Sequence, residues 1–142
     1  MNIYAIICTR DRNNVSETTD KLLGFLCSTE IKVFLMSGAT SLFDAYYGAY
    51  KKINPTEEDI VIFCHDDIEI RDSAPVFIKN LKEAFDSPAV GFVGAAGTME
   101  LGEDAVWWDM SRWQRGRHRG KVIHINKEGQ EYLTPYGPPG EV

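Results

Sequence analysis

Blocks of apolar and polar residues follow one another along the first 98 residues, and their period changes from block to block. Short continuous apolar runs are typical of strands buried on both faces of a sheet, and they predict strands at residues 2–8, 31–36, 59–64 and 90–95. Apolar residues three or four positions apart indicate one face of a helix, and they predict helices at residues 15–26, 41–53 and 77–85. Because each predicted helix joins two predicted strands, the pattern indicates an α/β fold, a three-layer αβα arrangement around a mostly parallel sheet with right-handed crossovers.

Two helix starts are visible in the sequence. Asn14 precedes the first helical segment, whose apolar stripe includes Thr19, and is a suitable N-cap. Ser41 and Asp44 stand three residues apart, as in a capping box, with Asp in place of the commoner Glu. The stripe of this second helix that we expect to face the core consists of Leu42, Tyr46, Ala49, Tyr50 and Ile53.

The pattern changes after residue 98. Residues 99–119 hold all three tryptophans and a basic cluster without clean periodicity, and residues 121–125 and 131–134 predict a hairpin of two strands. We therefore expect one domain over residues 1–142, with a parallel βα core up to residue 98 and a Trp- and Arg-rich loop and hairpin after it.

Composition narrows the class of protein. The net charge is −6 and the pI is near 5.0, which argues against general nucleic-acid binding. No apolar run is long enough to span a bilayer, and the first residues lack the charged start of a signal peptide. The three cysteines show no metal or redox spacing, and Cys8 and Cys64 fall in apolar strands. We therefore expect small buried thiols and a cytoplasmic location.

The third predicted strand ends abruptly in His65, Asp66 and Asp67. In parallel α/β sheets, ligands bind at the carboxyl ends of the strands. Side chains alternate along a strand, so His65 and Asp67 are expected on one side and Asp66 on the other. A carboxylate group beside other acidic groups favours the binding of a cation, which relieves the repulsion between them. A turn closed by hydrogen bonds, or a cap for the segment that follows, is the structural alternative for His65 and Asp67.

The other strand ends carry small or polar residues. Thr9 and Arg10 follow the first strand, Ser37 and Gly38 follow the second, and residues 94–98 follow the fourth. Glycines permit close approach of a backbone, while hydroxyl and amide groups bind a ribose or a base. A nucleotide with a metal-bridged diphosphate would use all of these groups. A tight turn that leaves a strand explains the glycines at 94 and 97 equally well.

Residues 107–121 combine tryptophans with arginines. Arg117, Arg119 and nearby basic residues suit a diphosphate because guanidinium groups match phosphate oxygens in pairs. Tryptophans beside them, such as Trp108, can stack on a sugar or a base. A solvated basic loop whose tryptophans pack over the sheet edge is an equal alternative. A contact between copies of the chain, in a homo-oligomer, is a further way to cover the tryptophans.

The chain resembles a known family through three motifs that occur in order. It is similar to inverting family 2-like glycosyltransferases of the GT-A fold, which carry an Asp-x-Asp motif where this chain has residues 65–67. It resembles still more the glycosyltransferase-like domain named after a streptomycin-biosynthesis protein. The motifs of that domain are His-x-Asp, Ser-Leu-x-x-Ala-Tyr and Gly-x-x-Gly-x-x-Gly, and they match residues 65–67, 41–46 and 91–97.

The resemblance implies the donor-binding half of a GT-A fold. Such a domain binds a nucleotide-diphospho-sugar for transfer of its glycosyl group to an acceptor, which here is unknown. The residues implied to bind the nucleotide are Thr9, Arg10, Ser37, Gly38 and Asp66. The residues implied to hold a divalent cation, Mn²⁺ or Mg²⁺, on the diphosphate are His65 and Asp67. The residues implied to contact the diphosphate or the sugar are Gly97, Trp108, Arg117 and Arg119.

Two departures from the family pattern leave the activity open. His65 replaces the first aspartate of the family motif, which removes one negative charge from the metal site. In the family, the acceptor-binding part and its general base follow about where this chain ends, so no catalytic residue is assigned and the chain alone is expected to be an incomplete enzyme. A non-catalytic GT-A-like binding or interaction module is the alternative. Nucleotidyl transfer is less favoured because the first strand lacks a lysine- and glycine-rich loop.

Overall fold

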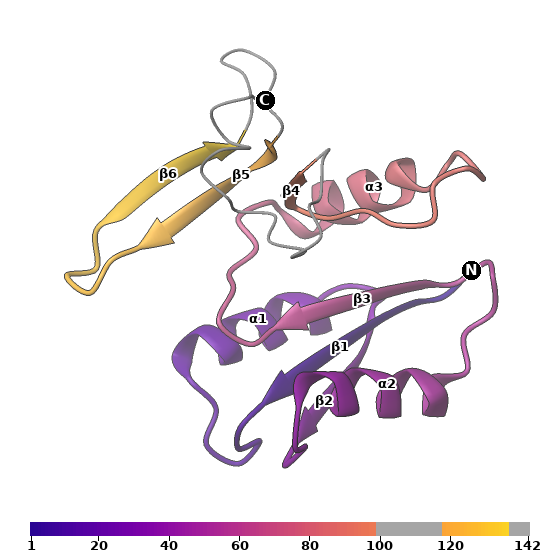
Figure 1. Ribbon diagram of the computed structural model, residues 1–142, viewed down its shortest axis with the longest axis horizontal. Helices are drawn as coiled ribbons and strands as arrows, with labels where there is room; N and C mark the ends of the chain where they lie inside the picture. The colour runs from indigo at the N-terminus through magenta and orange to yellow at the C-terminus, as the bar shows by residue number, and fades with distance from the viewer. Residues whose placement is uncertain (99–117, 137–142) are drawn as a thin grey trace. The chain divides into compact units, whose positions relative to one another are not determined.

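The computed structural model describes residues 1–98 and 118–136 of the chain (Figure 1). The chain divides into two compact units, unit 1 over residues 1–86 and unit 2 over residues 87–142. Among the described residues, each unit has a sheet of its own.

Unit 1 is built from strands that alternate with helices. Its elements are β1 (Ile3–Thr9), α1 (Glu17–Cys27), β2 (Lys32–Ser37), α2 (Leu42–Ile53), β3 (Ile60–His65) and α3 (Ala74–Ala84). Within the described residues, the sheet order is β2-β1-β3 and both pairings are parallel. The predicted α/β fold class with a parallel sheet is confirmed.

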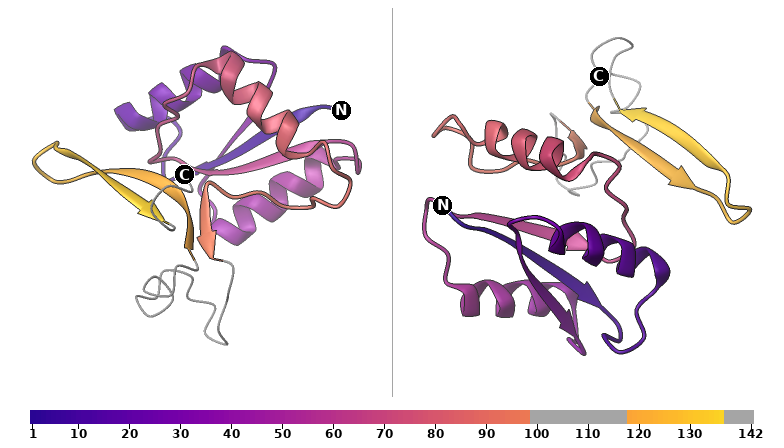
Figure 2. Two further views of the ribbon diagram at one scale, coloured as in Figure 1. Left: turned by 90° about the horizontal axis from the view of Figure 1, so that it is seen from above. Right: turned by 180° about the vertical axis from the view of Figure 1, so that it is seen from behind.

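The central strand β1 is apolar on both faces, and both faces are covered. Ala5 and Ile7 join Leu22 and Leu26 of α1 in one buried cluster, against which α3 also packs. Ile6 is fully buried on the other face, where α2 lies. Figure 2 shows α1 and α3 on one side of this sheet and α2 on the other. Burial of each large aliphatic side chain here stabilises the fold by about 1.5–3 kcal/mol.

The buried face of α2 differs from the predicted stripe. Its buried residues are Ala45 and Ala49, while Leu42 and Tyr50 are exposed. Alanines four positions apart lie above one another on a helix and let its backbone approach the sheet closely. The prediction was therefore wrong for Leu42 and Tyr50, because small side chains fill the narrow space between α2 and β1.

The N-cap half of the predicted capping box is confirmed, because Ser41 caps α2, while the Asp44 carboxylate accepts hydroxyl groups where a capping box uses the backbone N–H of the N-cap residue. Oγ of Ser41 accepts the N–H of Asp44 at 3.1 Å, and the Asp44 carboxylate accepts the hydroxyls of Thr40 and Ser41 at 2.5 and 2.9 Å. These hydrogen bonds hold the pKa of the Asp44 carboxyl below its usual range. The start of α2 is thus fixed beside the end of β2.

The N-cap of α1 is Ser16, so the prediction of Asn14 was wrong. Oγ of Ser16 accepts the N–H of Thr19 at 3.1 Å. The N–H of Asn14 instead donates to the carbonyl of Asp11 and closes a turn in the preceding loop. Both residue types cap helices well, and the loop geometry decides between them.

Unit 2 contains an antiparallel sheet among its described residues. Its strands are β4 (Ala96–Thr98), β5 (His118–Ile125) and β6 (Glu131–Tyr136), in the order β4-β5-β6. Strands β5 and β6 form the hairpin that the sequence predicts around residues 121–125 and 131–134. At its turn, Oδ1 of Asn126 accepts the N–H groups of Glu128 and Gln130 at 3.0 and 2.8 Å.

The predicted fourth parallel strand at residues 90–95 is absent from these described positions, which belong to no strand. The short β4 begins at Ala96 and pairs antiparallel with β5. Gly91 and Gly94 weaken this stretch as a strand, and Phe92 is 86 % exposed. An apolar run whose largest side chain faces solvent does not meet the requirement of a strand buried on both faces.

Candidate functional site

The carboxyl ends of β1, β2 and β3 lie at one edge of the unit 1 sheet. In the parallel register, Thr9 is the direct partner of Ser37, and Cys8 is the partner of His65. Thr9 is buried, Ser37 is half-buried and His65 is exposed. The structure therefore brings three of the predicted residues, one from each strand, to the edge where α/β sheets bind ligands.

The loops beyond β1 and β2 present two further predicted residues. Arg10 and Gly38 are exposed directly after Thr9 and Ser37. Gly38 has a φ of +70°, which favours glycine, and a Cβ at this position would meet no atom within 4 Å. The backbone conformation therefore favours glycine here, and the space beside it is open to a ligand.

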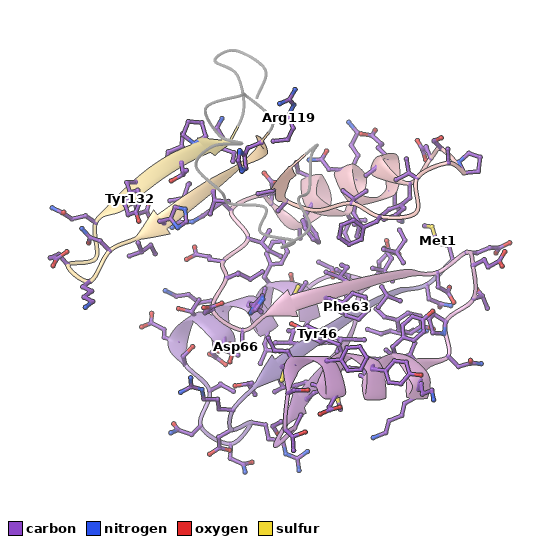
Figure 3. The ribbon with its side chains drawn as sticks, in the orientation of Figure 1. Met1, Tyr46, Phe63, Asp66, Arg119 and Tyr132 are labelled. Carbon is purple, nitrogen blue, oxygen red and sulfur yellow. The ribbon has the colours of Figure 1, made fainter. Side chains whose placement is uncertain are left out.

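The end of β3 carries the predicted metal ligands. The strand ends at His65, and Asp66 and Asp67 form the turn that follows. Figure 3 labels Asp66 at this turn. His65 and Asp67 are exposed, whereas Asp66 is half-buried. One short segment at the carboxyl edge of the sheet therefore carries all three residues.

The donor set at this turn is partial. Across residues 1–98 and 118–136, no three His, Cys, Asp or Glu side chains lie close enough together to hold a metal ion. Mg²⁺ sites commonly use one or two carboxylates and complete the set with substrate phosphates and water. One imidazole and one carboxylate therefore fit a cation that is shared with a phosphate ligand, and they do not fit a closed protein site.

Two side-chain hydroxyl groups bind the backbone on either side of His65. Oη of Tyr46 in α2 donates to the carbonyl of Cys64 at 2.8 Å, and Oγ1 of Thr19 in α1 donates to the carbonyl of Asp66 at 2.9 Å. Sequence reasoning missed both roles, because it placed Thr19 and Tyr46 in the apolar stripes of their helices. One feature of the sequence could have indicated these roles: each residue carries a hydroxyl group at a helix position that faces the core, where a hydroxyl needs a hydrogen-bond partner.

Burial sets the electrostatics of this edge. It raises the pKa of the Tyr46 phenol, which the neighbouring thiols and the carboxylates of Asp66 and Asp67 raise further. Burial, and then the Asp66 carboxylate, raise the pKa of the Cys8 thiol, and burial raises the pKa of Cys64 to about 11. The phenol and both thiols are therefore neutral near pH 7.

Unit 2 brings two other predicted residues together. Gly97 in β4 is the direct cross-strand partner of Arg119 in β5, and both line a cavity of about 230 Å³ beside Phe92. Arg119 also donates from Nη1 to the carbonyl of His118 at 2.8 Å. Trp108 and Arg117, which are also predicted to contact the diphosphate or the sugar, lie outside the described residues, and so does the Trp-rich segment predicted to join copies of the chain.

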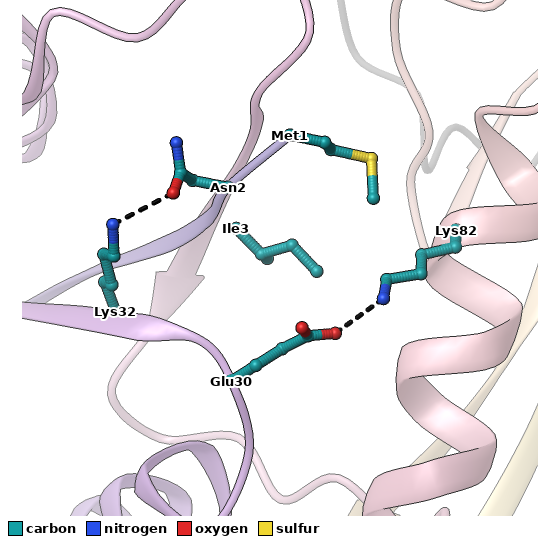
Figure 4. A pocket seen from close by; sticks show the side chains of 6 residues that line it. All are labelled: Met1, Asn2, Ile3, Glu30, Lys32 and Lys82. Carbon is teal, nitrogen blue, oxygen red and sulfur yellow. Dashed lines mark hydrogen bonds and ion pairs between the residues drawn. The ribbon is translucent and has the colours of Figure 1, made fainter.

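A smaller cavity, of about 90 Å³, lies at the opposite end of the unit 1 strands (Figure 4). Met1, Asn2 and Ile3 line it at the start of β1. Nζ of Lys82 forms an ion pair with Glu30 at 2.7 Å across this cavity, and Nζ of Lys32 donates to Asn2 at 3.0 Å. Both ammonium groups already have partners and the space is small, so this cavity is not a candidate ligand site. Its polar contacts instead join the residues around the start of β2 to the start of β1 and to α3.

Residues 5–138 match the model of a glycosyltransferase-like family, which is nearly the whole chain. The chain belongs to this glycosyltransferase-like family. The match confirms the resemblance to family 2-like glycosyltransferases, and the resemblance to the streptomycin-biosynthesis domain stays a prediction. No curated protein and no solved structure matches this glycosyltransferase-like chain. Of the helices described in residues 1–98 and 118–136, none has the length and apolar character needed to cross a membrane.

Proposed function

We propose that the carboxyl edge of the unit 1 sheet binds a nucleotide-diphospho-sugar, the donor of a glycosyl transfer. The observation that carries the proposal is the register of the three parallel strands, which sets Thr9 beside Ser37 and Cys8 beside His65. Polar groups from three separate strands converge there, as in other open α/β sheets that bind nucleotides. Membership of the glycosyltransferase-like family supports a sugar nucleotide as the ligand.

Nucleotide binding is proposed for the residues at the ends of β1 and β2 and for the half-buried carboxylate after β3. Hydroxyl and backbone groups at the strand ends bind the base and ribose, and the open space at Gly38 admits them close to the backbone. The residues in this role are Thr9, Arg10, Ser37, Gly38 and Asp66.

Diphosphate binding is proposed for His65 and Asp67 together with Mn²⁺ or Mg²⁺. A cation at this position neutralises the charge that grows on the leaving diphosphate as the glycosidic bond breaks. An imidazole ligand favours Mn²⁺ over Mg²⁺. The exposure of both side chains supports this role, because each is accessible to a ligand that supplies the remaining oxygens.

A second, separate proposal concerns unit 2. Gly97 and Arg119 line a cavity with one aromatic ring and one guanidinium group, and these are partners for a sugar face and a phosphate. We infer that they contact the diphosphate or the sugar of a ligand, together with Trp108 and Arg117.

Titration by calorimetry tests the donor site. UDP and GDP are added to the chain with and without Mn²⁺, for the wild type, Asp67→Asn and the matched control Asp86→Asn. Asp86 is an exposed carboxylate just after α3, away from the strand ends. We expect one nucleoside diphosphate to bind more tightly with Mn²⁺, and Asp67→Asn to weaken that binding by at least about tenfold, since even residues that only support a metal ligand contribute 10- to 100-fold.

The control variant is expected to bind as the wild type does. If neither UDP nor GDP binds in the presence of Mn²⁺, the donor-site proposal is wrong. If binding depends on Mn²⁺ but Asp67→Asn leaves it unchanged, the cation is held by other groups and the assignment of Asp67 fails.

A further inference from the structure

The backbone around His65 is held by side chains from two different helices. The carbonyl before it, on Cys64, accepts a hydrogen bond from Tyr46, and the carbonyl after it, on Asp66, accepts one from Thr19. We call this pair of hydrogen bonds the hydroxyl clamp. Because α1 and α2 lie on opposite faces of the sheet (Figure 2), the clamp holds the segment from both faces.

Each hydroxyl of the clamp is itself oriented by its surroundings. Thr19 is 1 % exposed, and its Oγ1 lies 2.8 Å from Oγ of the N-cap residue Ser16. The Thr19 hydroxyl hydrogen goes to the Asp66 carbonyl, so the Ser16 hydroxyl donates to Thr19. A chain of hydrogen bonds therefore runs from the N-cap of α1 to the turn after β3.

The Tyr46 side is fixed by packing. The ring of Tyr46 meets the ring of Phe63 edge-on, with centroids 5.3 Å apart (Figure 3). The capping box at Ser41 fixes the first turn of α2, which places Tyr46 one turn further along the helix. The hydroxyl of Tyr46 is thus presented to one carbonyl group by a capped helix and an edge-on aromatic contact.

We propose that Thr19 and Tyr46 are positioning residues, which orient His65 and Asp67 through the peptide groups that flank them. This inference rests on the proposed function, in which His65 and Asp67 bind the cation on the diphosphate. Hydrogen bonds to the groups behind a metal ligand fix its direction, and a ligand set of only two side chains depends strongly on that direction. The clamp therefore tunes metal-assisted binding without touching the nucleotide.

Three substitutions separate the hydroxyl groups from the packing. Tyr46→Phe keeps the ring against Phe63 and removes the hydroxyl. Thr19→Val keeps the volume of the side chain and leaves the N–H of residue 19 bonded to Ser16, while Thr19→Ser keeps the hydroxyl and is the matched control. Thermal unfolding of each variant shows whether the fold is retained.

The measured quantity is the ratio of two dissociation constants, for the nucleoside diphosphate without and with Mn²⁺. We expect this ratio to fall by about tenfold in Tyr46→Phe and in Thr19→Val and to be restored in Thr19→Ser. Binding without Mn²⁺ is expected to stay unchanged in all three. Amide hydrogen exchange at Asp66 and Asp67 is expected to accelerate in the two variants that lack a hydroxyl.

The outcomes distinguish the two proposals. A wild-type ratio above one that is unchanged in both hydroxyl-deficient variants overturns the positioning role alone. Equal weakening of binding with and without Mn²⁺ shows a general structural role and also overturns it. A wild-type ratio of one rejects metal-assisted donor binding, and the positioning role falls with it, whatever the exchange rates show.

Discussion

At the scale of single residues, Asp59 joins the beginnings of two strands. Its carboxylate accepts the N–H and the side-chain amide of Asn2 at 2.6 and 3.0 Å, and the N–H and hydroxyl of Thr56 at 3.0 Å each. These hydrogen bonds hold the pKa of the Asp59 carboxyl well below its usual value. Asp59 thus ties the start of β1 to the start of β3, which is 57 residues away in the chain.

We expect Asp59→Asn to lower the free energy of unfolding near neutral pH. The folded-state pKa lies below the ordinary value of 3.8, so the stabilisation by the carboxylate is present above that value and is lost as the pH falls below it. Urea unfolding at about pH 7 and about pH 3 measures both effects. The variant should be less stable than the wild type at the higher pH and should lose less stability on acidification.

The control for this experiment is Asp72→Asn, which alters an exposed carboxylate. It should follow the wild type at both pH values. Equal stability of Asp59→Asn and the wild type at neutral pH would show that the hydrogen bonds to Asn2 and Thr56 contribute nothing net.

Cysteine chemistry is a second consequence at the residue scale. Cys64 is buried with a pKa raised to about 11, whereas Cys27 is exposed. Only the thiolate reacts with alkylating reagents, and a pKa two units above the ordinary 9.0 lowers its population about 100-fold. We expect Cys27 to be alkylated first and Cys64 last at mildly alkaline pH, as measured for each cysteine by peptide mass spectrometry. Equal rates for both cysteines in the folded chain would contradict the burial of Cys64.

At the scale of elements, β5 depends on a close backbone contact. Gly120 has a φ of +118°, and a Cβ at this position would lie 2.5 Å from the carbonyl oxygen of Ala95 and the Cα of Ala96. The neighbouring atoms are backbone atoms, which cannot move away as a flexible side chain can. A residue other than glycine therefore forces β4 and β5 apart.

We expect Gly120→Ala to destabilise the unit 2 sheet by about 1–3 kcal/mol through backbone strain, and further through loss of the β4–β5 pairing. Amide hydrogen exchange of β5 residues measures this locally. Gly91→Ala is the matched control, because a Cβ there meets no atom within 4 Å. Protection of β5 that is unchanged in Gly120→Ala would show that the two strands do not pack in this way.

At the scale of the whole molecule, unit 1 has a core that joins nearly all of its length. The buried cluster contains residues from β1, α1 and β3, and side chains of α3 pack against it. The central strand β1 pairs with β2 on one side and with β3 on the other. The core is therefore incomplete until β3 is in place, although β1 and β2 are neighbours in the chain.

Truncation tests this dependence. A chain of residues 1–86 retains every strand and helix of unit 1, whereas residues 1–58 lack β3 and α3. We expect the longer chain to unfold cooperatively in thermal circular dichroism and the shorter one to show no cooperative transition, because it leaves one side of β1 unpaired and part of the core exposed. A cooperative transition in residues 1–58 would contradict the central role of β3.

The elements of unit 1 were predictable from sequence because each is marked by a local pattern. The apolar runs of β1, β2 and β3 and the capping box at Ser41 depend only on neighbouring residues. The run at residues 90–95 shows the limit of this reasoning. It looks like a strand by hydrophobicity, but its glycines and the exposed Phe92 leave it unpaired among the described strands.

The candidate site was predictable to the level of its strand ends. Parallel order places the residues after β1, β2 and β3 at one edge without knowledge of any contact. The hydroxyl clamp was not predictable, because Thr19 and Asp66 are 47 residues apart and nothing local marks their hydrogen bond. From sequence alone, a threonine or tyrosine in a core-facing stripe is interpreted as a packing residue. Its hydrogen bond becomes evident only when the structure shows which carbonyl group lies beside it.

The division into two units has an optical consequence. All three tryptophans, at positions 107, 108 and 113, belong to unit 2, and unit 1 contains tyrosines but no tryptophan. Fluorescence excited selectively in indole therefore originates from unit 2 alone. A ligand or denaturant that changes the emission acts on the environment of that unit, whereas events confined to the parallel sheet of unit 1 must be followed through its tyrosines, among them Tyr46 of the clamp.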